Sequence, residues 1–287
     1  MTPHTPRDQL AVFARLTRIE HAFLLALAVI AGALLTTKTL DWNQVALGVA
    51  CVFFIEIGAF ALNDLLDLKA DKANKRKDRP LVTGQATPRQ AMLIYKTSLP
   101  LGVLFAALAN TNAFIIATAF AILSVAYSYS LKNLPAVGNA FIALAMAVPF
   151  VFGNYLVSSQ TSLAALMLAS IAFVFGFGRE IAKSIQDVQG DKKAGRKTLP
   201  VVVGVEQSKY YASYFLMLGI FMAVIPFLQI PEFYYDPFYA VFWIVTDALV
   251  AYAIYLTLTL KNFKLVRNLT LAAQLTGLLG FLLGALF

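Results

Sequence analysis

Long, nearly uninterrupted apolar runs dominate the hydrophobic pattern of this chain. They lack the two-residue alternation of barrel strands, so the pattern predicts helices. A helix that crosses a bilayer needs about 20 mostly apolar residues. Nine stretches approach or reach that length: 22–37, 45–62, 91–108, 113–127, 136–156, 163–177, 210–228, 238–260 and 269–287. The first, fourth and sixth are short, and we expect their helices to extend into the flanking polar residues.

Composition supports a chain that uses the bilayer as its solvent. Of the 287 residues 60% are hydrophobic and only 13% are charged, whereas about a quarter of the residues in a soluble domain are charged. The single cysteine, Cys51, lies inside the second apolar stretch and excludes an intrachain disulfide. We therefore predict an all-α, integral membrane bundle of nine transmembrane helices, forming one polytopic domain over residues 1–287.

The charges indicate a membrane orientation rather than a nucleic-acid partner. The net charge is +8, but nine spans place nearly all Lys and Arg residues on the side of the N-terminus, and only Lys38 on the other side. Basic loops face the cytoplasm. The sequence thus predicts a multi-pass protein of the cell membrane, with the N-terminus and two Asp-rich loops in the cytoplasm and no nucleic-acid partner.

The two longest loops on the basic side share one plan. Residues 63–84 and 187–204 each run from acids through a basic cluster to a Pro, apolar residues and a Gly. They follow the second and sixth spans, which are four spans apart. This pattern indicates a diverged duplication of four-helix units, with a ninth helix appended.

The first of these loops contains a candidate metal site. Asn63, Asp67 and Asp71 are spaced four residues apart, so they share one stripe if the second span continues as a helix. Mg²⁺ is a hard cation that binds through one or two carboxylates together with substrate phosphates. Asp64 lies just off this stripe. The stripe therefore predicts a site for Mg²⁺ and a phosphorylated substrate.

The sixth span offers a matching stripe of two cations followed by two acids: Arg179, Lys183, Asp187 and Asp191. A diphosphate gripped by Lys and Arg at one end and through metal at the other would be stabilised as a leaving group. Acids and bases four apart at a helix end are also typical of a solvated, salt-bridged face. Two such loops on the same side of the membrane favour a shared site.

Three motifs resemble those of the UbiA superfamily of intramembrane prenyltransferases. NDLLDLKAD followed by DRP is similar to its first signature, DVQGD followed by KKAGRKTLP to its second, and YSYSLK to its Tyr–Lys element at the end of the fourth span. Together with nine helices, the resemblance covers essentially the whole chain. It implies that a prenyl group passes from its diphosphate to an acceptor nucleophile.

The resemblance also implies roles for individual residues. It implies that Mg²⁺ ions are held by Asn63, Asp67, Asp71, Asp187 and Asp191. The expected catalytic residues are Asp64, Asp67, Asp71, Tyr127, Lys132, Asp187 and Asp191, with Tyr127 as a hydrogen-bond donor. The expected substrate-binding residues are Arg18, Arg79, Lys132, Arg179, Lys183, Arg196 and Lys197.

The acceptor is suggested by likeness within the superfamily. The segment GREIAKSIQDVQGDKKAGRKTLPVVVG is most similar to digeranylgeranylglyceryl phosphate synthases, the archaeal ether-lipid branch. That likeness implies geranylgeranyl diphosphate as donor and geranylgeranylglyceryl phosphate as acceptor. The segment RIEH, at residues 18–21, instead resembles some hydroxybenzoate polyprenyltransferases. An aromatic acceptor (4-hydroxybenzoate or a naphthoate) is therefore the alternative, and a chlorophyll-type acceptor is a third.

A membrane transporter is the alternative from another functional class. Its substrate site would lie near the midplane of the membrane, on discontinuous helices, whereas most charges here gather at one interface. Two acids inside apolar spans, Glu56 and Asp247, fit a transporter better, because ionisable groups within a membrane are usually functional. The sequence leaves open their roles, the donor chain length, the base that accepts the acceptor's proton and the oligomeric state.

Overall fold

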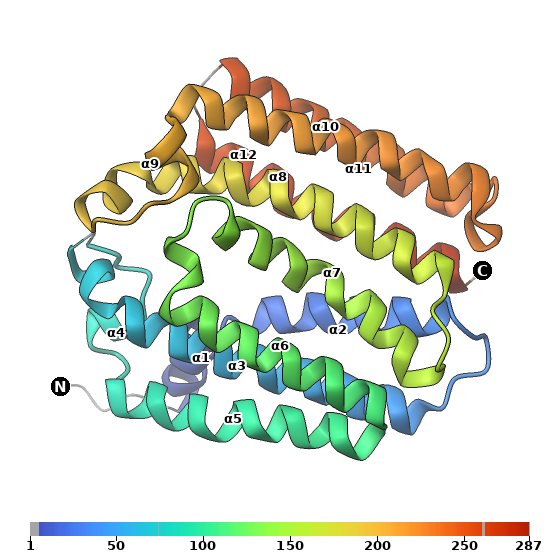
Figure 1. The fold of residues 1–287 in the computed structure, drawn as a ribbon, viewed down its shortest axis with the longest axis horizontal. Helices are drawn as coiled ribbons and strands as arrows, with labels where there is room; N and C mark the ends of the chain where they lie inside the picture. The colour runs from blue at the N-terminus through green and yellow to red at the C-terminus, as the bar shows by residue number, and fades with distance from the viewer. Residues whose placement is uncertain (1–5, 74, 260–261, 287) are drawn as a thin grey trace. The chain divides into compact units, whose positions relative to one another are not determined.

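Helices make up all the regular secondary structure of the described residues, 6–73, 75–259 and 262–286, in a computed structural model (Figure 1). In chain order the α-helices are α1 (Pro6–Thr17), α2 (Ile19–Leu34), α3 (Trp42–Ala73), α4 (Pro80–Thr83), α5 (Pro88–Ala109), α6 (Thr111–Tyr129), α7 (Val137–Val157), α8 (Leu163–Lys193), α9 (Leu199–Val203), α10 (Val205–Gln229), α11 (Pro237–Thr259) and α12 (Phe263–Leu286). Two short 3-10 helices, η1 (Leu131–Asn133) and η2 (Pro231–Phe233), complete the series.

Among the described residues, eight helices are individually long and apolar enough to cross a membrane: α3, α5, α6, α7, α8, α10, α11 and α12. The helices α1 and α2 qualify together as a ninth span, bent by 58° between Thr17 and Ile19. The predicted multi-pass, all-helical architecture is confirmed, with eight spans in the described residues, or nine if the bent pair counts as one. Residues 260 and 287, where the predicted eighth and ninth spans end, lie outside the described residues.

The two helices that carry the predicted acids, α3 and α8, are the longest among the described residues. The structure extends α3 to 32 residues and α8 to 31, well beyond the apolar runs 45–62 and 163–177. The acids expected in loops therefore lie on helices, and that part of the prediction is corrected. The extra turns carry the polar stripes beyond the apolar length that a bilayer requires.

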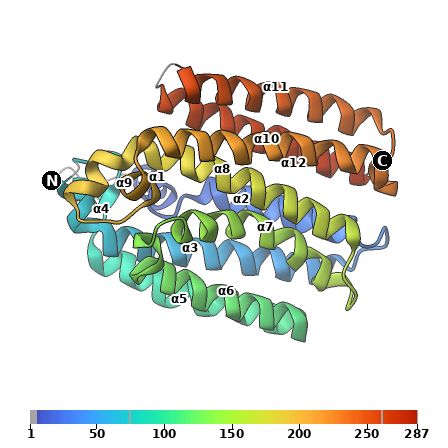
Figure 2. The same cartoon turned by 45° about the horizontal axis from the view of Figure 1, so that its top comes forward.

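The chain forms two compact units. The first comprises Met1–Ala26 and Trp42–Ser130, in which α3 packs against α1, α5 and α6. The second comprises Leu27–Asp41 and Leu131–Phe287, in which α8 packs against α7, α10 and α12 (Figure 2). Each unit thus contains one of the two long acid-bearing helices at its centre.

Close helix packing in the second unit depends on glycine. A β-carbon added at Gly153 of α7 would clash with the carbonyl oxygen of Val29 in α2, and one added at Gly32 would clash with the carbonyl oxygen of Phe150. Small residues let the backbones of membrane helices approach closely, where lipid provides no hydrophobic drive for association. The second half of α2 is therefore held against α7 by backbone contact.

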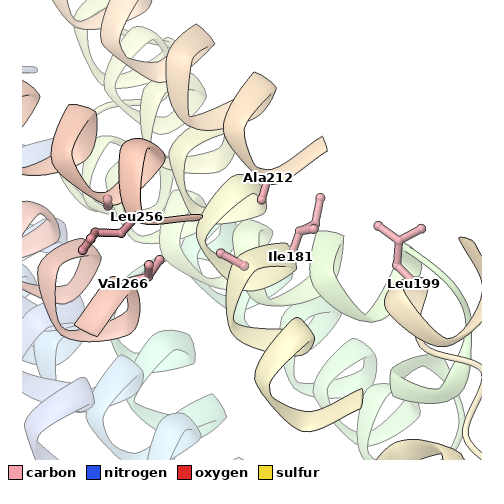
Figure 3. Packing of buried hydrophobic residues seen from close by; sticks show 7 residues of the cluster. Ile181, Leu199, Ala212, Leu256 and Val266 are labelled. Atoms are coloured by element: carbon pink, nitrogen blue, oxygen red, sulfur yellow. The ribbon is translucent and has the colours of Figure 1, made fainter. Parts of the chain in front are cut away.

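A buried apolar cluster supports the polar end of α8. Ile181 and Ala182 of α8 pack with Leu199, Ala212, Ala253, Leu256 and Val266, so side chains from α9, α10, α11 and α12 gather around one segment (Figure 3). In the first unit a similar cluster of Leu16, Leu81, Ala86 and Ala91 packs with Leu65 and Leu68 of α3. Both clusters fix the segments that carry the predicted site residues.

Candidate functional site

The first acidic stripe lies on the last turns of α3. Asn63, Asp67 and Asp71 all belong to this helix, so their four-residue spacing places them on one face. All three are partly accessible to solvent. Asp64, which follows Asn63 on the same helix, is only 2% exposed. The stripe therefore divides into accessible oxygen ligands and one buried carboxylate.

Two arginines surround the buried carboxylate of Asp64. Arg18 donates from Nη2 to Asp64 Oδ1 at 2.7 Å, and Arg79 Nη1 lies 3.2 Å from Oδ1 and 3.4 Å from Oδ2. The sequence predicted Asp64 as a catalytic residue and the two arginines as substrate ligands. The structure brings the three together in one ion cluster, a pairing that the sequence analysis missed because Arg18 lies 46 residues from Asp64.

Arg18 is held by its backbone and by a ring as well as by Asp64. It sits at the break between α1 and α2 with a positive φ of 47°, a conformation that non-glycine residues seldom adopt. Its guanidinium lies over the ring of Phe60 at 4.2 Å, a favourable cation–π geometry. These contacts restrict the side chain to one direction.

Arg79 links Asp64 to the acidic stripe. Its Nε lies 3.6 Å from Asp71 Oδ2, and that buried nitrogen has no hydrogen-bond partner among the described residues. On the exposed loop beside it, Arg76 donates two hydrogen bonds of 2.9 Å to Asp78. These bonds lower the pKa of Asp78 to about 2. Ion pairs of Arg76 with Asp78 and of Arg79 with Asp71 therefore fix the loop after α3.

The second acidic stripe lies on the last turns of α8, where its two acids differ in environment. Asp187 is exposed, whereas Asp191 is 8% exposed and accepts a hydrogen bond from the hydroxyl of Thr198 at 3.0 Å. Arg196 Nη1 lies 3.7 Å from Asp191 Oδ1. The Asp191 carboxylate is thus nearly buried, and it also anchors the loop that leads to α9.

The two acid-bearing helices end in the same way. The amide of Arg76 donates to the carbonyl of Asp71 at 3.0 Å, and that of Arg196 to the carbonyl of Asp191 at 2.9 Å. The residues before these arginines, Lys75 and Gly195, both have positive φ. This is the Schellman pattern of helix termination. It supports the predicted internal duplication, since the last acid of each motif occupies the same position in it.

The loops after the two helices continue the correspondence. Each leads to a short helix, α4 or α9, with a proline in its first turn. Each short helix is followed by a glycine of positive φ, Gly84 at 77° and Gly204 at 88°. Glycine adopts positive φ without steric cost, although the two differ in ψ, which is 9° at Gly84 and 161° at Gly204. The shared order of acids, cations, Pro and Gly thus encodes a similar succession of helix end, loop and short helix in each unit.

A residue that the sequence analysis missed, Glu180, pairs with the two predicted cations of α8. Arg179 Nη1 donates to Glu180 Oε1 at 2.6 Å, and Lys183 Nζ lies 3.3 and 3.0 Å from the two carboxylate oxygens. Arg179 and Glu180 are both nearly buried, while the Lys183 side chain is 41% exposed. An acid three residues before a lysine, within an apolar helix, was the signal that could have identified Glu180.

The predicted Tyr–Lys element lies where α6 ends and α7 begins. Tyr127 belongs to the last turns of α6, and Lys132 lies in η1. Gly138 packs against the backbone of Lys132, where an added β-carbon would stand 3.1 Å from its carbonyl oxygen. The remaining predicted cation, Lys197, is exposed on the loop before α9. The close approach of Gly138 fixes the backbone from which Lys132 extends.

The acids of each unit suit Mg²⁺ by their chemistry. Among the described residues no three His, Cys, Asp or Glu side chains converge into a closed metal cage. Mg²⁺ does not require one, because it retains waters and binds through one or two carboxylates plus substrate phosphates. The carboxylates of Asp67 and Asp71 and the amide oxygen of Asn63 on α3 are oxygen donors of the type that Mg²⁺ prefers, as are the carboxylates of Asp187 and Asp191 on α8.

Comparison with known proteins agrees with these features. The model of the UbiA prenyltransferase family matches residues 24–286, which include both acid-bearing helices and the Tyr–Lys element. The chain belongs to the UbiA prenyltransferase family. The family resemblance drawn from the motifs is thereby confirmed, and with it the classification of this UbiA protein as a prenyltransferase rather than a transporter.

Individual UbiA relatives match along nearly the whole chain. A digeranylgeranylglyceryl phosphate synthase of Archaeoglobus fulgidus is 36% identical over 277 residues, covering 94% of each protein. A solved structure of a digeranylgeranylglyceryl phosphate synthase superposes with a TM-score of 0.74 at 25% identity, covering 97% of this chain and 99% of that one. A UbiA homologue from Archaeoglobus fulgidus bound to GPP and Mg²⁺ has the same fold, with a TM-score of 0.72 at 20% identity over 96% and 99% of the two chains.

Proposed function

We propose that this protein transfers a geranylgeranyl group from its diphosphate to geranylgeranylglyceryl phosphate, with Mg²⁺, in ether-lipid biosynthesis. The observation that carries the proposal is the pair of matching helix ends on α3 and α8. Each presents acids beside clustered cations, and each ends in the same Schellman motif. The Archaeoglobus relative, at 36% identity, bears the name of this activity.

The proposed site residues fall into two groups, those that would bind metal and those that would bind the anionic diphosphate. Asn63, Asp67, Asp71, Asp187 and Asp191 would hold Mg²⁺, which supplies positive charge to the diphosphate oxygens as the leaving group departs. Arg79, Lys183, Arg196 and Lys197 supply charge-assisted hydrogen bonds to the same diphosphate, as does Lys132, with Tyr127 as a further donor. Arg79, Lys183 and Arg196 are held by ion pairs with Asp64, Glu180 and Asp191 before the substrate arrives, so these three need little reorganisation during the reaction.

The bond changes are a simple substitution at the allylic carbon. The C1–O bond of the prenyl diphosphate breaks with its electron pair on the leaving diphosphate. A new C1–O bond forms to the hydroxyl oxygen of the acceptor, whose proton is released. Positive charge develops on the prenyl group as the C1–O bond weakens. Stabilisation of the leaving diphosphate by the fixed cations therefore lowers the barrier.

A phosphorylated acceptor is supported by the surplus of cations near both helix ends. Beyond those paired with acids, Lys72 and Lys77 follow the first stripe, and Lys192 and Lys193 lie at the end of α8, all of them exposed. A second anion, the phosphate of the acceptor, needs such charges. We place both helix ends on the cytoplasmic side, because the basic loops of membrane proteins face the cytoplasm.

An acceptor panel tests the proposed function. Purified protein in detergent is incubated with labelled geranylgeranyl diphosphate, Mg²⁺ and one of three acceptors: geranylgeranylglyceryl phosphate, 4-hydroxybenzoate or dihydroxynaphthoate. Mass spectrometry identifies the product. We expect a digeranylgeranyl ether of glyceryl phosphate and only background product with the aromatic acceptors. Product from an aromatic acceptor alone would assign the chain to quinone biosynthesis instead.

A further inference from the structure

The buried carboxylate of Asp64 has a role that differs from that of its accessible neighbours. We propose that Asp64 is a positioning residue, which binds no metal and instead holds the guanidiniums of Arg18 and Arg79 in place for the anionic substrate. This inference rests on the proposed prenyl-transfer function and deepens it. It assigns to Asp64 a task distinct from that of Asn63, Asp67 and Asp71.

The contacts of Asp64 leave no place for a cation. Both of its carboxylate oxygens are engaged by arginine, Oδ1 by Arg18 at 2.7 Å and by Arg79 at 3.2 Å, and Oδ2 by Arg79 at 3.4 Å. The residue is 2% exposed. A divalent cation approaching it would meet two positive charges first, and they would repel it. The immediate neighbourhood of Asp64 thus favours guanidinium over metal.

Burial and partners, rather than helix angle, distinguish Asp64 from the ligand stripe. With 3.6 residues in each turn, Asp64 lies only about 20° from Asp71 and about 60° from Asp67 around α3. Asp64 is nevertheless 2% exposed and meets Arg18 at the break between α1 and α2, whereas Asp67 and Asp71 are partly accessible. One short motif on α3 thus places its acids in two environments.

The arginines keep donors for an anion beyond their pairing with Asp64. Arg79 also lies 3.6 Å from Asp71 through its Nε, so the ion cluster adjoins the predicted ligand stripe. A guanidinium carries five N–H donors, and the buried Nε of Arg79 has no hydrogen-bond partner among the described residues. Arg18 and Arg79 are 20% and 17% exposed, so parts of both side chains reach solvent.

The local backbone also points to a functional demand at Arg18. A residue with positive φ other than glycine carries strain of a kind that is common at binding sites. The guanidinium of Arg18 is further fixed over Phe60. A buried ion pair contributes little to stability by itself. The gain in folding free energy from the Arg18–Asp64 pair therefore does not account for the strained backbone at Arg18. A guanidinium that is already held in position binds an anion at a lower cost in free energy.

The test separates positioning from metal binding by measuring two dependences of the same variants. Asp64→Asn and Asp67→Asn are compared with the unaltered protein in steady-state assays, with the prenyl diphosphate and Mg²⁺ titrated separately. For Asp64→Asn we expect kcat/KM to fall by about 10- to 100-fold, mainly because the KM for the prenyl diphosphate rises. The Mg²⁺ requirement should stay unchanged. Asp67→Asn should raise the Mg²⁺ concentration needed for half-maximal rate.

A binding measurement gives a readout that does not depend on turnover. Mn²⁺ binding, followed by electron paramagnetic resonance, should be unchanged in Asp64→Asn and weakened in Asp67→Asn. A mutant cycle isolates the arginines: adding Asp64→Asn to Arg18→Gln should cost much less than it costs alone, because a residue that acts through another loses its effect with that partner. Glu206→Gln, at an acid that is 69% exposed, is the control for loss of one negative charge.

Each outcome decides the proposal. Equal shifts in Mg²⁺ requirement and Mn²⁺ affinity for Asp64→Asn and Asp67→Asn would make Asp64 a metal ligand and overturn it, as would full additivity with Arg18→Gln. If Asp64→Asn does not fold, Asp64→Glu keeps the charge but moves the carboxylate, and the same split between donor KM and Mg²⁺ dependence is read from it. Absence of prenyl transfer in the unaltered protein would instead refute the proposed function.

Discussion

The hydroxyl of Thr198 donates a hydrogen bond of 3.0 Å to Asp191, the last acid of α8. The carboxylate that is predicted to bind Mg²⁺ therefore also secures the loop that leads to α9. Asp187, one helical turn earlier, is exposed and has no comparable structural task among the contacts described. Two acids of one motif thus differ in what their loss should do to the fold.

This difference predicts separate effects on turnover and stability. Asp187→Asn and Asp191→Asn should each reduce turnover on the order of 100-fold, because each would weaken the hold on the Mg²⁺ that stabilises the charge on the leaving diphosphate in the proposed reaction. Only Asp191→Asn should also lower the free energy of unfolding, by about 1–2 kcal/mol, since a hydrogen bond to a charged group is weakened. Turnover and thermal melting in detergent, measured on the same preparations, check both effects. Equal stability of the two variants would contradict the anchoring role of Asp191.

Removal of divalent metal is expected to stop the reaction reversibly. Excess chelator should abolish consumption of the prenyl diphosphate, and Mg²⁺ added beyond the chelator should restore it, because the carboxylates proposed as ligands could hold a diphosphate only through a cation. Melting of the chelated protein serves as the control for its folded state. Full turnover in excess chelator would refute the metal assignment of Asn63, Asp67, Asp71, Asp187 and Asp191.

The buried acid Glu180 is expected to be essential for the stability of α8. Glu180→Gln leaves the nearly buried guanidinium of Arg179 without its countercharge, a loss that typically costs about 3–5 kcal/mol. Asp78→Asn removes an acid from an ion pair that is 35% and 58% exposed, and should cost at most about 1 kcal/mol. Melting temperatures of the two variants compare them directly. Similar melting temperatures would show that the Arg179–Glu180 pair contributes little.

The ion pair of Asp78 predicts a small dependence of stability on pH. Hydrogen bonds from Arg76 lower the pKa of Asp78 to about 2, below its value of about 3.9 in an unfolded chain. The stabilisation is therefore complete above about pH 4 and is lost as the pH falls through about 2. Because Asp78 is 58% exposed, solvent screening keeps it below about 1 kcal/mol. The difference in melting temperature between the unaltered protein and Asp78→Asn should shrink from pH 5 to pH 2.

Glycine packing in the second unit predicts opposite outcomes for two similar substitutions. Gly153→Ala should destabilise the protein, because the new methyl group would clash with the backbone carbonyl of Val29. Gly219→Ala is the matched control: its β-carbon would meet Phe175 at an ordinary distance of 3.5 Å. It should be neutral or stabilising by up to about 1 kcal/mol, from helix propensity. A Gly153→Ala variant as stable as Gly219→Ala would show that α2 and α7 can move apart without cost.

Much of the architecture was predictable from the sequence, for physical reasons that act locally. A run of apolar residues must leave water wherever it lies, so the spans and their helical form were correctly predicted from the pattern alone. The four-residue spacing of Asn63, Asp67 and Asp71 correctly predicted a shared helix face, because that depends only on the helical period. The sequence also predicted the common plan of the two acid-bearing segments, which both end in a Schellman motif and lead to a short helix with a proline in its first turn.

What only the tertiary structure decided is which charges meet. The pairing of Arg18 with Asp64 joins residues 46 positions apart. It depends on a break in the helix at Arg18, which the local sequence pattern did not predict. Burial separated Asp64 from Asp67, and Asp191 from Asp187, although each pair looks alike in the sequence. Glu180 emerged as the partner of Arg179 and Lys183 for the same reason. Burial and ion pairing depend on neighbours brought together by packing, and the free energy of a charge is set by those neighbours rather than by its spacing along the chain.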